Sequence, residues 1–426
     1  MTISDRFSRR VGGFLEPITM AKAIGLYPCL EAVEGMAGPR VDYQGREYLM
    51  FGSNDYLGLA QDPRVKEAAI RAIRRFGTGR GGAPLICGYT TLHTQLEERL
   101  SQFLKREACV LFASGYHANV GCASALTRKA DSLICDADCH ASIRDGSAMS
   151  NAHVAFFRHN DLEALSAVLD EVDSVHKVVI VDGVYSMRGD LAPLPEMTEI
   201  TSQADAFLIV DDAHGLGVLG RNGRGTPEHF DCEDSVDLLV GTMSKSLATT
   251  GGFAVGDENV IEYIRHQARS GIFSASSTPA NVAAALAALQ IVEEEPQRRD
   301  HVLTMSGMLR DGLQDASHIA LGHGSAIVSI HIGDMWGTLR ASKALFESGL
   351  ITIPVIQPGV PAGQELIRMH VTAAHTEEDI ATALNVFEQC ADAFETDTAS
   401  QENVALEKHQ HHHDEVVECT GQQTSR

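Results

Sequence analysis

The stretch AFLIVDDAH, residues 206–214, indicates the fold class of this chain of 426 residues. It is an apolar run of strand length that ends in two aspartates and a histidine. A strand that is apolar at every position is buried on both faces, as in parallel sheets covered by helices. Similar runs recur along the chain, separated by helix-like segments: ACVLFA (108–113), DSLICDA (131–137), HVAFFRH (153–159), KVVIVDGV (177–184), VDLLVGT (236–242) and GGFAVG (251–256). We therefore expect an α/β fold with a mostly parallel sheet covered on both faces.

The composition is that of an ordinary globular protein, with 44% hydrophobic and 21% charged residues. The net charge of −23 disfavours nucleic acid and anionic membranes as partners. No apolar run is long enough to span a bilayer. Nine scattered cysteines predict reduced thiols in a cytoplasmic protein. Cys135, Cys139 and His140 lack a second ligand pair, so we expect no metal site.

The chain divides into four predicted segments. Residues 1–44 form an N-terminal arm, and residues 45–285 form a large cofactor-binding domain. A long helical stretch, residues 279–313, leads into a mixed α+β pattern, so residues 286–392 are predicted to form a small C-terminal domain. The polar tail, residues 393–426, is expected to be disordered.

Chemically active residues follow several of the predicted strands, where a parallel sheet binds its ligands. Asp211 and His214 follow one strand, and His140 follows another. Gly115 and Tyr116 open a helix after a third strand, a position where backbone N–H groups can bind phosphate. Each feature alone also fits a structural role: His140 as a helix cap, and the two aspartates of the 206–214 stretch as a capping pair.

Lys245 lies in the stretch GTMSKSLATTGGFAV, residues 241–255, among small and hydroxylated residues. An amine in an enclosed site can have a lowered pKa and form a Schiff base. A lysine, an acid at a strand end, a phosphate-binding helix start and a histidine that can stack on a ring together predict a pyridoxal 5'-phosphate site.

From residue 43 to residue 387 the chain resembles the α-oxoamine synthase family of fold-type I pyridoxal phosphate enzymes. The motifs that carry the resemblance are GTMSKS, VDDAH, DADCHAS, GVYSMRGD, GIFSASSTP and ELIRMHVTAAHT. The resemblance implies a large domain with a mostly parallel, seven-stranded sheet and a smaller α+β C-terminal domain.

The resemblance also implies a role for individual residues. Lys245 matches the Schiff-base lysine, Asp211 the acid on the pyridine nitrogen, His214 the group near the ring hydroxyl, and His140 the histidine stacked on the ring. The remaining cofactor contacts match Thr242, Ser244, Gly115 and Tyr116 around the phosphate, Ser186 close to the cofactor, and Ser274 reaching the phosphate of the other subunit of a homodimer. Arg368 matches the arginine that holds the amino acid carboxylate, and Asn54 matches a nearby substrate contact.

The family joins an amino acid to an acyl-CoA and releases CoA and CO2. The SKS context of Lys245, DADCHASIRDG and GVYSMRGDLAPL are similar to soluble bacterial serine palmitoyltransferases, which implies L-serine, palmitoyl-CoA and the product 3-ketodihydrosphingosine. GQELIRMHVTAAHT is at least as similar to 8-amino-7-oxononanoate synthase and 2-amino-3-ketobutyrate CoA ligase.

Two positions depart from the family pattern. Pro84 stands where the family usually has arginine, and Gln357 stands where bacterial serine palmitoyltransferases have arginine. The choice of amino acid and acyl chain therefore stays open, as do an aminotransferase or lyase on the same fold and a non-catalytic subunit. Membrane contact is expected to be peripheral at most.

Overall fold

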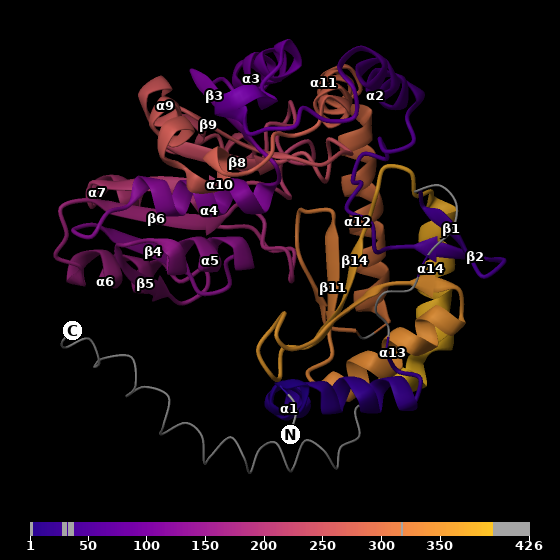
Figure 1. Ribbon diagram of the computed structural model, residues 1–426. Helices are drawn as coiled ribbons and strands as arrows, with labels where there is room; N and C mark the ends of the chain where they lie inside the picture. Colours follow the sequence, from indigo (N-terminus) through magenta and orange to yellow (C-terminus); the bar gives the residue numbers. More distant parts are fainter. Residues whose placement is uncertain (1–2, 28–31, 33–37, 317, 395–426) are drawn as a thin grey trace.

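The computed structural model describes residues 3–27, 32, 38–316 and 318–394, and its centre is a seven-stranded sheet (Figure 1). The strands follow the order β3 (Ala108–Phe112), β9 (Gly252–Gly256), β8 (Leu238–Thr242), β7 (Ala206–Asp211), β6 (Lys177–Asp182), β4 (Ser132–Asp136) and β5 (His153–Phe157). The strands from β8 to β5 are parallel, whereas β9 is antiparallel to both of its neighbours. The predicted mostly parallel sheet is confirmed.

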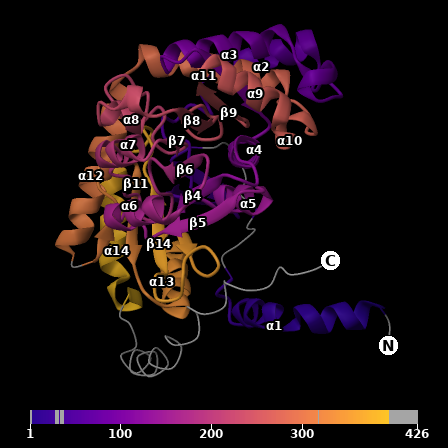
Figure 2. The ribbon, with the colours of Figure 1, turned by 90° about the vertical axis from the view of Figure 1, so that its left-hand side faces the viewer.

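The sheet is covered on both faces because successive residues of each strand point to opposite sides. On β6, Val178 and Ile180 join a core cluster with residues of α4 (Gly115–Leu126) and α5 (Ala141–Met149). Val179 and Val181 join a second cluster, with residues of α3 (Thr91–Phe103), α6 (Leu162–Glu171), α7 (Leu194–Gln203) and α11 (Pro279–Glu294). Figure 2 shows α4 and α5 on one side of the strands and α6 and α7 on the other.

The predicted helical stretch over residues 279–313 is two helices, α11 and α12 (Gln297–Asp315). The two helices are separated at Glu295, which leaves helical geometry with φ −122 and ψ 64 before Pro296. Proline lacks the N–H that a continuing helix needs, so the chain turns here. α11 packs against α2 (Pro63–Phe76).

The C-terminal part has a four-stranded antiparallel sheet in the order β10 (Ala320–Leu321), β11 (Ile327–His331), β14 (Leu366–His370) and β13 (Ile353–Val355). Its helices are α13 (Met335–Glu347) and α14 (Glu377–Gln389). A three-stranded sheet joins β1 (Arg40–Tyr43), β2 (Arg46–Met50) and β12 (Leu350–Ile351). Because β2 pairs with β12, the proposed large domain shares a sheet with the C-terminal part, and the domain limits remain a proposal.

The remaining elements of the described chain are α1 (Ile3–Ala23), η1 (Pro84–Gly88), α8 (Thr226–His229), η2 (Glu233–Ser235), α9 (Glu258–Gln267), α10 (Arg269–Ile272) and η3 (Ala391–Phe394). The tail predicted over residues 393–426 lies outside the described residues from residue 395 onward. In the part of the chain that is described, no helix combines the length and the apolar character needed to cross a bilayer.

Candidate active site

Lys245 lies in the tight connection between β8 and β9. Two backbone hydrogen bonds close this connection, from Met243 N to Gly251 O at 2.9 Å and from Ala248 N to Lys245 O at 2.8 Å. β9 begins at Gly252, where a Cβ would lie 2.3 Å from the carbonyl oxygen of Ser114. Glycine at this position lets the connection lie against the turn that precedes α4.

The Lys245 side chain is half-buried, and its ammonium forms neither a hydrogen bond nor an ion pair with any residue that the structure describes. Burial lowers the pKa of Lys245 to about 8, against the opposing negative charges of Asp211 and Asp182. About a tenth of this amine is therefore neutral at pH 7, and the neutral fraction that a nucleophile or base requires grows as the pH rises.

Asp211 ends β7 and is buried, with a hydrogen-bond donor on each oxygen. Asn119 Nδ2 donates to Asp211 Oδ2 at 2.5 Å, and Ala213 N donates to Asp211 Oδ1 at 3.0 Å. Its neighbour Asp212 instead accepts both Thr226 N (2.7 Å) and Thr226 Oγ1 (2.5 Å) at the start of α8. Of the two aspartates considered as a capping pair, Asp212 therefore has the structural role, through its hydrogen bonds to the start of α8.

His140 is the N-cap residue of α5 and lies at the end of a hydrogen-bond chain from Asp211. Ser142 Oγ accepts from Asn119 Nδ2 at 2.9 Å and lies 2.7 Å from His140 Nδ1. Ser142 N also donates to His140 Nδ1 at 3.2 Å. His140 Nδ1 is thus an acceptor, which leaves the proton of the neutral ring on Nε2. Burial lowers the pKa of His140 and favours this neutral form.

His214 is buried beside a tyrosine that the sequence had not singled out. The Tyr56 hydroxyl lies 2.6 Å from His214 Nδ1 and 3.3 Å from Asn54 Oδ1. Burial places the pKa of His214 well below its ordinary value, and the positive charge of Lys245 adds to the effect. Two predicted site residues, His214 and Asn54, are therefore joined through Tyr56.

The start of α4 and the end of β8 form a cradle of donors. Gly115 opens α4, and a Cβ there would lie 3.0 Å from Thr242 Cβ, so the close approach requires glycine. Thr242 Oγ1 and Ser244 Oγ lie 2.8 Å apart. Backbone N–H groups at a helix start together with hydroxyls suit a phosphate. The Tyr116 side chain is partly exposed, and its hydroxyl donates to Asp145.

Arg368 projects from β14 toward the loop that follows β6. Its Nη1 donates to Ser186 O at 2.8 Å and contacts Met187 Sδ at 3.3 Å. Its Nε is buried and has no hydrogen-bond partner within the described chain. Burial lowers the pKa of Arg368, which remains a cation. This unused donor fits a carboxylate ligand.

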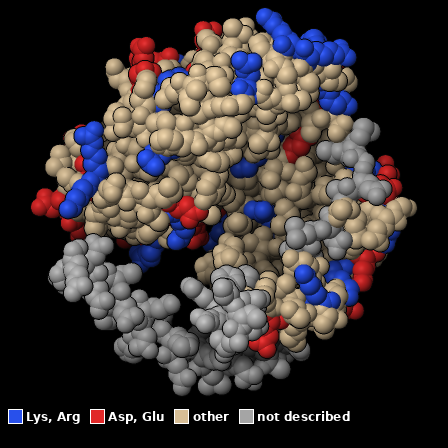
Figure 3. Space-filling model, viewed as in Figure 1, with Lys and Arg blue, Asp and Glu red and all other residues tan. Residues whose placement is uncertain are grey.

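Arg368 also lines a cavity of about 1370 Å³ between the two parts of the molecule. Its walls come from α1, the turn around Cys139, α13 and the loop that contains Gln357. Figure 3 shows the molecule hollowed between the part with the seven-stranded sheet and the C-terminal part.

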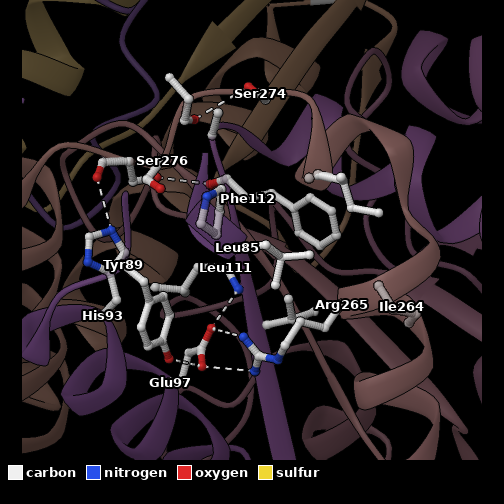
Figure 4. A pocket seen from close by; sticks show the side chains of 17 residues that line it. Leu85, Tyr89, His93, Glu97, Leu111, Phe112, Ile264, Arg265, Ser274 and Ser276 are labelled. Carbon is white, nitrogen blue, oxygen red and sulfur yellow. Dashed lines mark hydrogen bonds and ion pairs between the residues drawn. The ribbon is translucent and has the colours of Figure 1, made fainter. Parts of the chain in front are cut away.

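Ser274 lies elsewhere, in a small pocket of about 30 Å³ beside β3 (Figure 4). Pro84 lines the same pocket, and the salt bridge between Arg265 and Glu97 (3.0 Å) closes one side of it. Apart from Ser274, none of the predicted site residues, Lys245 included, lines this pocket.

Sequence reasoning missed three buried polar groups of the site: Asn119, Tyr56 and Asp182. Asp182 Oδ2 accepts from His140 N at 2.8 Å, and burial raises the pKa of Asp182 well above its usual value. Asn119 carried a signal that could have been used, since it stands one helical turn after Gly115 and is followed by the small and mostly apolar run VGCASAL. A polar side chain buried in such a helix needs a partner.

These groups fit pyridoxal phosphate: an amine of lowered pKa for the aldehyde, a buried carboxylate for the pyridine nitrogen, and a cradle for the phosphate. The family model for aminotransferase class I and II matches residues 46–387. The chain is 40% identical over 389 residues to a serine palmitoyltransferase from Sphingobacterium spiritivorum, which covers 90% of this chain and 97% of the relative. It is 38% identical over 376 residues to an 8-amino-7-oxononanoate synthase from Thermoanaerobacter pseudethanolicus, which covers 88% and 95%.

Two solved structures are similar throughout. A serine palmitoyltransferase from Sphingomonas wittichii has a TM-score of 0.85 and 34% identity, and the match covers 89% of this chain and 98% of that one. A serine palmitoyltransferase variant from S. paucimobilis with a bound PLP–myriocin aldimine has a TM-score of 0.88 and 32% identity, with 91% and 98% covered. The chain therefore belongs to the aminotransferase class I and II family, and it is a fold-type I pyridoxal phosphate enzyme similar to the α-oxoamine synthases.

Proposed function

We propose that this enzyme is an acyltransferase that condenses L-serine with palmitoyl-CoA and releases 3-ketodihydrosphingosine, CoA and CO2. The observation that carries the choice of a long acyl chain is the cavity beside Arg368. Apolar side chains of α13 and the C-terminal sheet line much of it, including Met335, Leu339 and Leu321. A cavity of this size and lining accommodates an extended hydrocarbon chain next to the group that holds the amino acid.

The bound cofactor supplies an electron sink for the negative charge that develops at the amino acid Cα. Lys245 would bind the aldehyde of the cofactor, and its lowered pKa keeps a fraction of the amine neutral, so that it would serve as the base toward the substrate Cα–H. Asp211 would hold a proton on the pyridine nitrogen. Arg368 binds the substrate carboxylate through its unused donors, and His140 presents its Nε2 proton to the same group.

The remaining contacts follow the same scheme. Thr242, Ser244, Gly115 and Tyr116 bind the phosphate, His214 lies at the ring hydroxyl, Ser186 lies close to the cofactor, and Asn54 contacts the substrate. Ser274 acts in the site of a second subunit, so the proposed enzyme is a homodimer. We place it in the cytoplasm, in line with its nine scattered cysteines. Ile86 (81% exposed) and Phe273 (73% exposed), which lie next to the pocket of Ser274 in sequence, support burial of this face by a second copy.

A second candidate is a synthase of the 8-amino-7-oxononanoate type, which uses a shorter acyl thioester. The 38% identity to an 8-amino-7-oxononanoate synthase supports it. Arg188 is compatible with it, since this side chain lines the large cavity and forms no ion pair with any residue in the described ranges. An unpaired cation there fits either the phosphates of CoA or an anionic group on a short acyl chain.

An absorbance titration tests the proposal. The holoenzyme is mixed with L-serine, glycine, L-alanine or L-threonine, and acyl-CoAs of increasing length are then added while CoA release is measured. We expect a spectral response to L-serine and CoA release with long-chain acyl-CoA. Release only with short acyl thioesters selects the second candidate. Pyruvate-dependent transamination without CoA release would overturn both.

A further inference from the structure

His159 lies between two carboxylates, outside the set of residues assigned to the cofactor or the substrate. Its Nδ1 is 3.0 Å from Asp136 Oδ1 and its Nε2 is 2.7 Å from Asp190 Oδ2. The His159 side chain is 15% exposed and that of Asp136 is fully buried. The ring of Tyr185 stands edge-on to the imidazole, with 4.4 Å between ring centroids.

Both ring nitrogens of His159 face acceptors, so each must carry a proton and the ring must be an imidazolium. Burial lowers the pKa of His159, but the hydrogen bonds to Asp136 and Asp190 outweigh this effect and raise it to about 10. The titratable groups that face the ring are Asp136 on β4 and Asp190 and Tyr185 on the loop after β6. On the same loop as His159, Arg158 pairs with Asp161 at 2.6 Å.

Asp136 connects His159 to the turn that carries His140, residues 136–140. It ends β4, and its Oδ1 also accepts from Asp138 N at 2.7 Å. Its Oδ2 accepts from Asn160 N at 2.9 Å. The carboxylate therefore fixes both this turn and the backbone beside His159.

Asp190 connects His159 to the loop of residues 184–191, which is closed by a bridge between Val184 and Leu191 and by a hydrogen bond from Tyr185 N to Asp190 O at 2.9 Å. Side chains of the C-terminal sheet form hydrogen bonds with the same loop from the other side. Arg368 Nη1 binds Ser186 O there, and Ser329 Oγ donates to Met187 O at 2.7 Å. The 184–191 loop thus connects the part with the seven-stranded sheet, through His159, to the C-terminal part, through Arg368.

We propose that His159 is a positioning residue, whose imidazolium ties the 136–140 turn to the 184–191 loop and thereby sets the guanidinium of Arg368 for the substrate carboxylate. The assignment of the carboxylate to Arg368 rests on the function proposed above. Removal of the imidazolium leaves Asp136 and Asp190 without their shared partner, and their mutual repulsion then loosens the loop that supports Arg368.

Hydrogen exchange measured by mass spectrometry on the holoenzyme tests whether His159 stabilises the 184–191 loop, and it does not depend on turnover. In His159→Gln, peptides that cover residues 184–191 are expected to exchange about tenfold faster or more, whereas peptides of α11 keep the wild-type rate. His153→Gln is the matched control, because His153 is an exposed histidine at the start of β5, the strand that precedes His159. Unchanged exchange over residues 184–191 in His159→Gln would overturn the proposal.

Amino acid binding supplies the second readout. The Kd for L-serine, followed through cofactor absorbance, is expected to rise about tenfold or more in His159→Gln, with little change in cofactor retention. In Asp190→Asn one carboxylate is lost, so the pKa of His159 falls and L-serine affinity should decline as the pH rises through the neutral range. The wild type should hold its affinity well above that range. An Asp190→Asn profile that matches the wild type would contradict the mechanism. A wild type with no response to any amino acid would reject the proposed function, while the exchange data still decide whether His159 holds the loop.

Discussion

Asn119 Nδ2 lies 2.5 Å from Asp211 Oδ2, and the same nitrogen lies 2.9 Å from Ser142 Oγ. One amide therefore joins the acid at the end of β7 to the serine that binds His140. The two side chains proposed to contact opposite parts of the cofactor are held by a single hydrogen-bond chain. This arrangement fixes the orientation of the Asp211 carboxylate before any ligand binds.

Replacement of Asn119 by leucine should lower cofactor affinity and turnover together. The change removes a donor to a buried carboxylate, which costs about 1–3 kcal/mol, or roughly 5- to 150-fold. The apparent Kd for pyridoxal phosphate and kcat are the quantities to measure. Ser124→Ala is the control, because Ser124 lies on the same helix and its hydroxyl binds only backbone carbonyls of α4. Equal cofactor affinity in Asn119→Leu and the wild type would remove Asn119 from this role.

Lys245→Ala should abolish covalent attachment of the cofactor and reduce turnover by at least about a thousandfold. Borohydride reduction followed by peptide mass spectrometry should find the cofactor mass on the Lys245 peptide of the wild type only. Lys66→Ala, a surface change on α2, should retain both properties. A variant without Lys245 that turned over at the wild-type rate would refute the mechanism.

The rate at which the apoenzyme takes up pyridoxal phosphate should rise with pH through about 8. The nucleophile is the neutral amine of Lys245, and its pKa of about 8 means that the neutral fraction grows as the pH increases through that value. Stopped-flow absorbance of the apoenzyme between pH 6 and 10 gives the midpoint. A rate that still rises at pH 10 without reaching a midpoint, as the ordinary lysine value of 10.5 requires, would show that burial does not act on this amine.

The sheet could be predicted because its evidence is local. Every strand of the seven-stranded sheet appears in the sequence as an apolar run, and alternation with helices indicates parallel pairing. The sequence predicted the helical content of residues 279–313, and Pro296, in the charged stretch between the two apolar helices, marks the break between α11 and α12. The pairing of β2 with β12 joins residues about 300 positions apart and has no local signal.

The site was predictable only where a motif named its residues. Lys245, Asp211, His140 and His214 stand at strand ends, where position alone suggests a ligand. Tyr56 and Asn119 act through contacts made by folding, over 158 and 92 positions of sequence. Ser274, in contrast, was predicted from its motif, but in the structure of one chain it lines a separate small pocket beside β3.

Arg188→Ala should raise the KM for acyl-CoA about fivefold and leave the Kd for L-serine unchanged. The side chain lines the large cavity and has no ion-pair partner in the described ranges, so its loss removes one partly solvated contact worth about 1 kcal/mol. Steady-state kinetics with palmitoyl-CoA and a short acyl-CoA separate the two proposed substrates. An effect confined to the short acyl-CoA points to recognition of its acyl end. A change in L-serine affinity instead would place Arg188 at the amino acid.

The stability that His159 provides should be lost in alkaline solution. Its folded-state pKa is about 10 and its ordinary value is 6.5, so the imidazolium stabilises the fold fully below about pH 6.5 and this contribution disappears as the pH rises through 10. Each pKa unit corresponds to about 1.4 kcal/mol, which makes the effect large enough to measure. Thermal unfolding of the wild type and of His159→Gln between pH 6 and 10.5 should give midpoints that differ most at pH 6 and converge at the alkaline end. His153→Gln should follow the wild type throughout. A difference between wild type and His159→Gln that stayed constant to pH 10.5 would mean that the ring contributes by packing against Tyr185 and not by its charge.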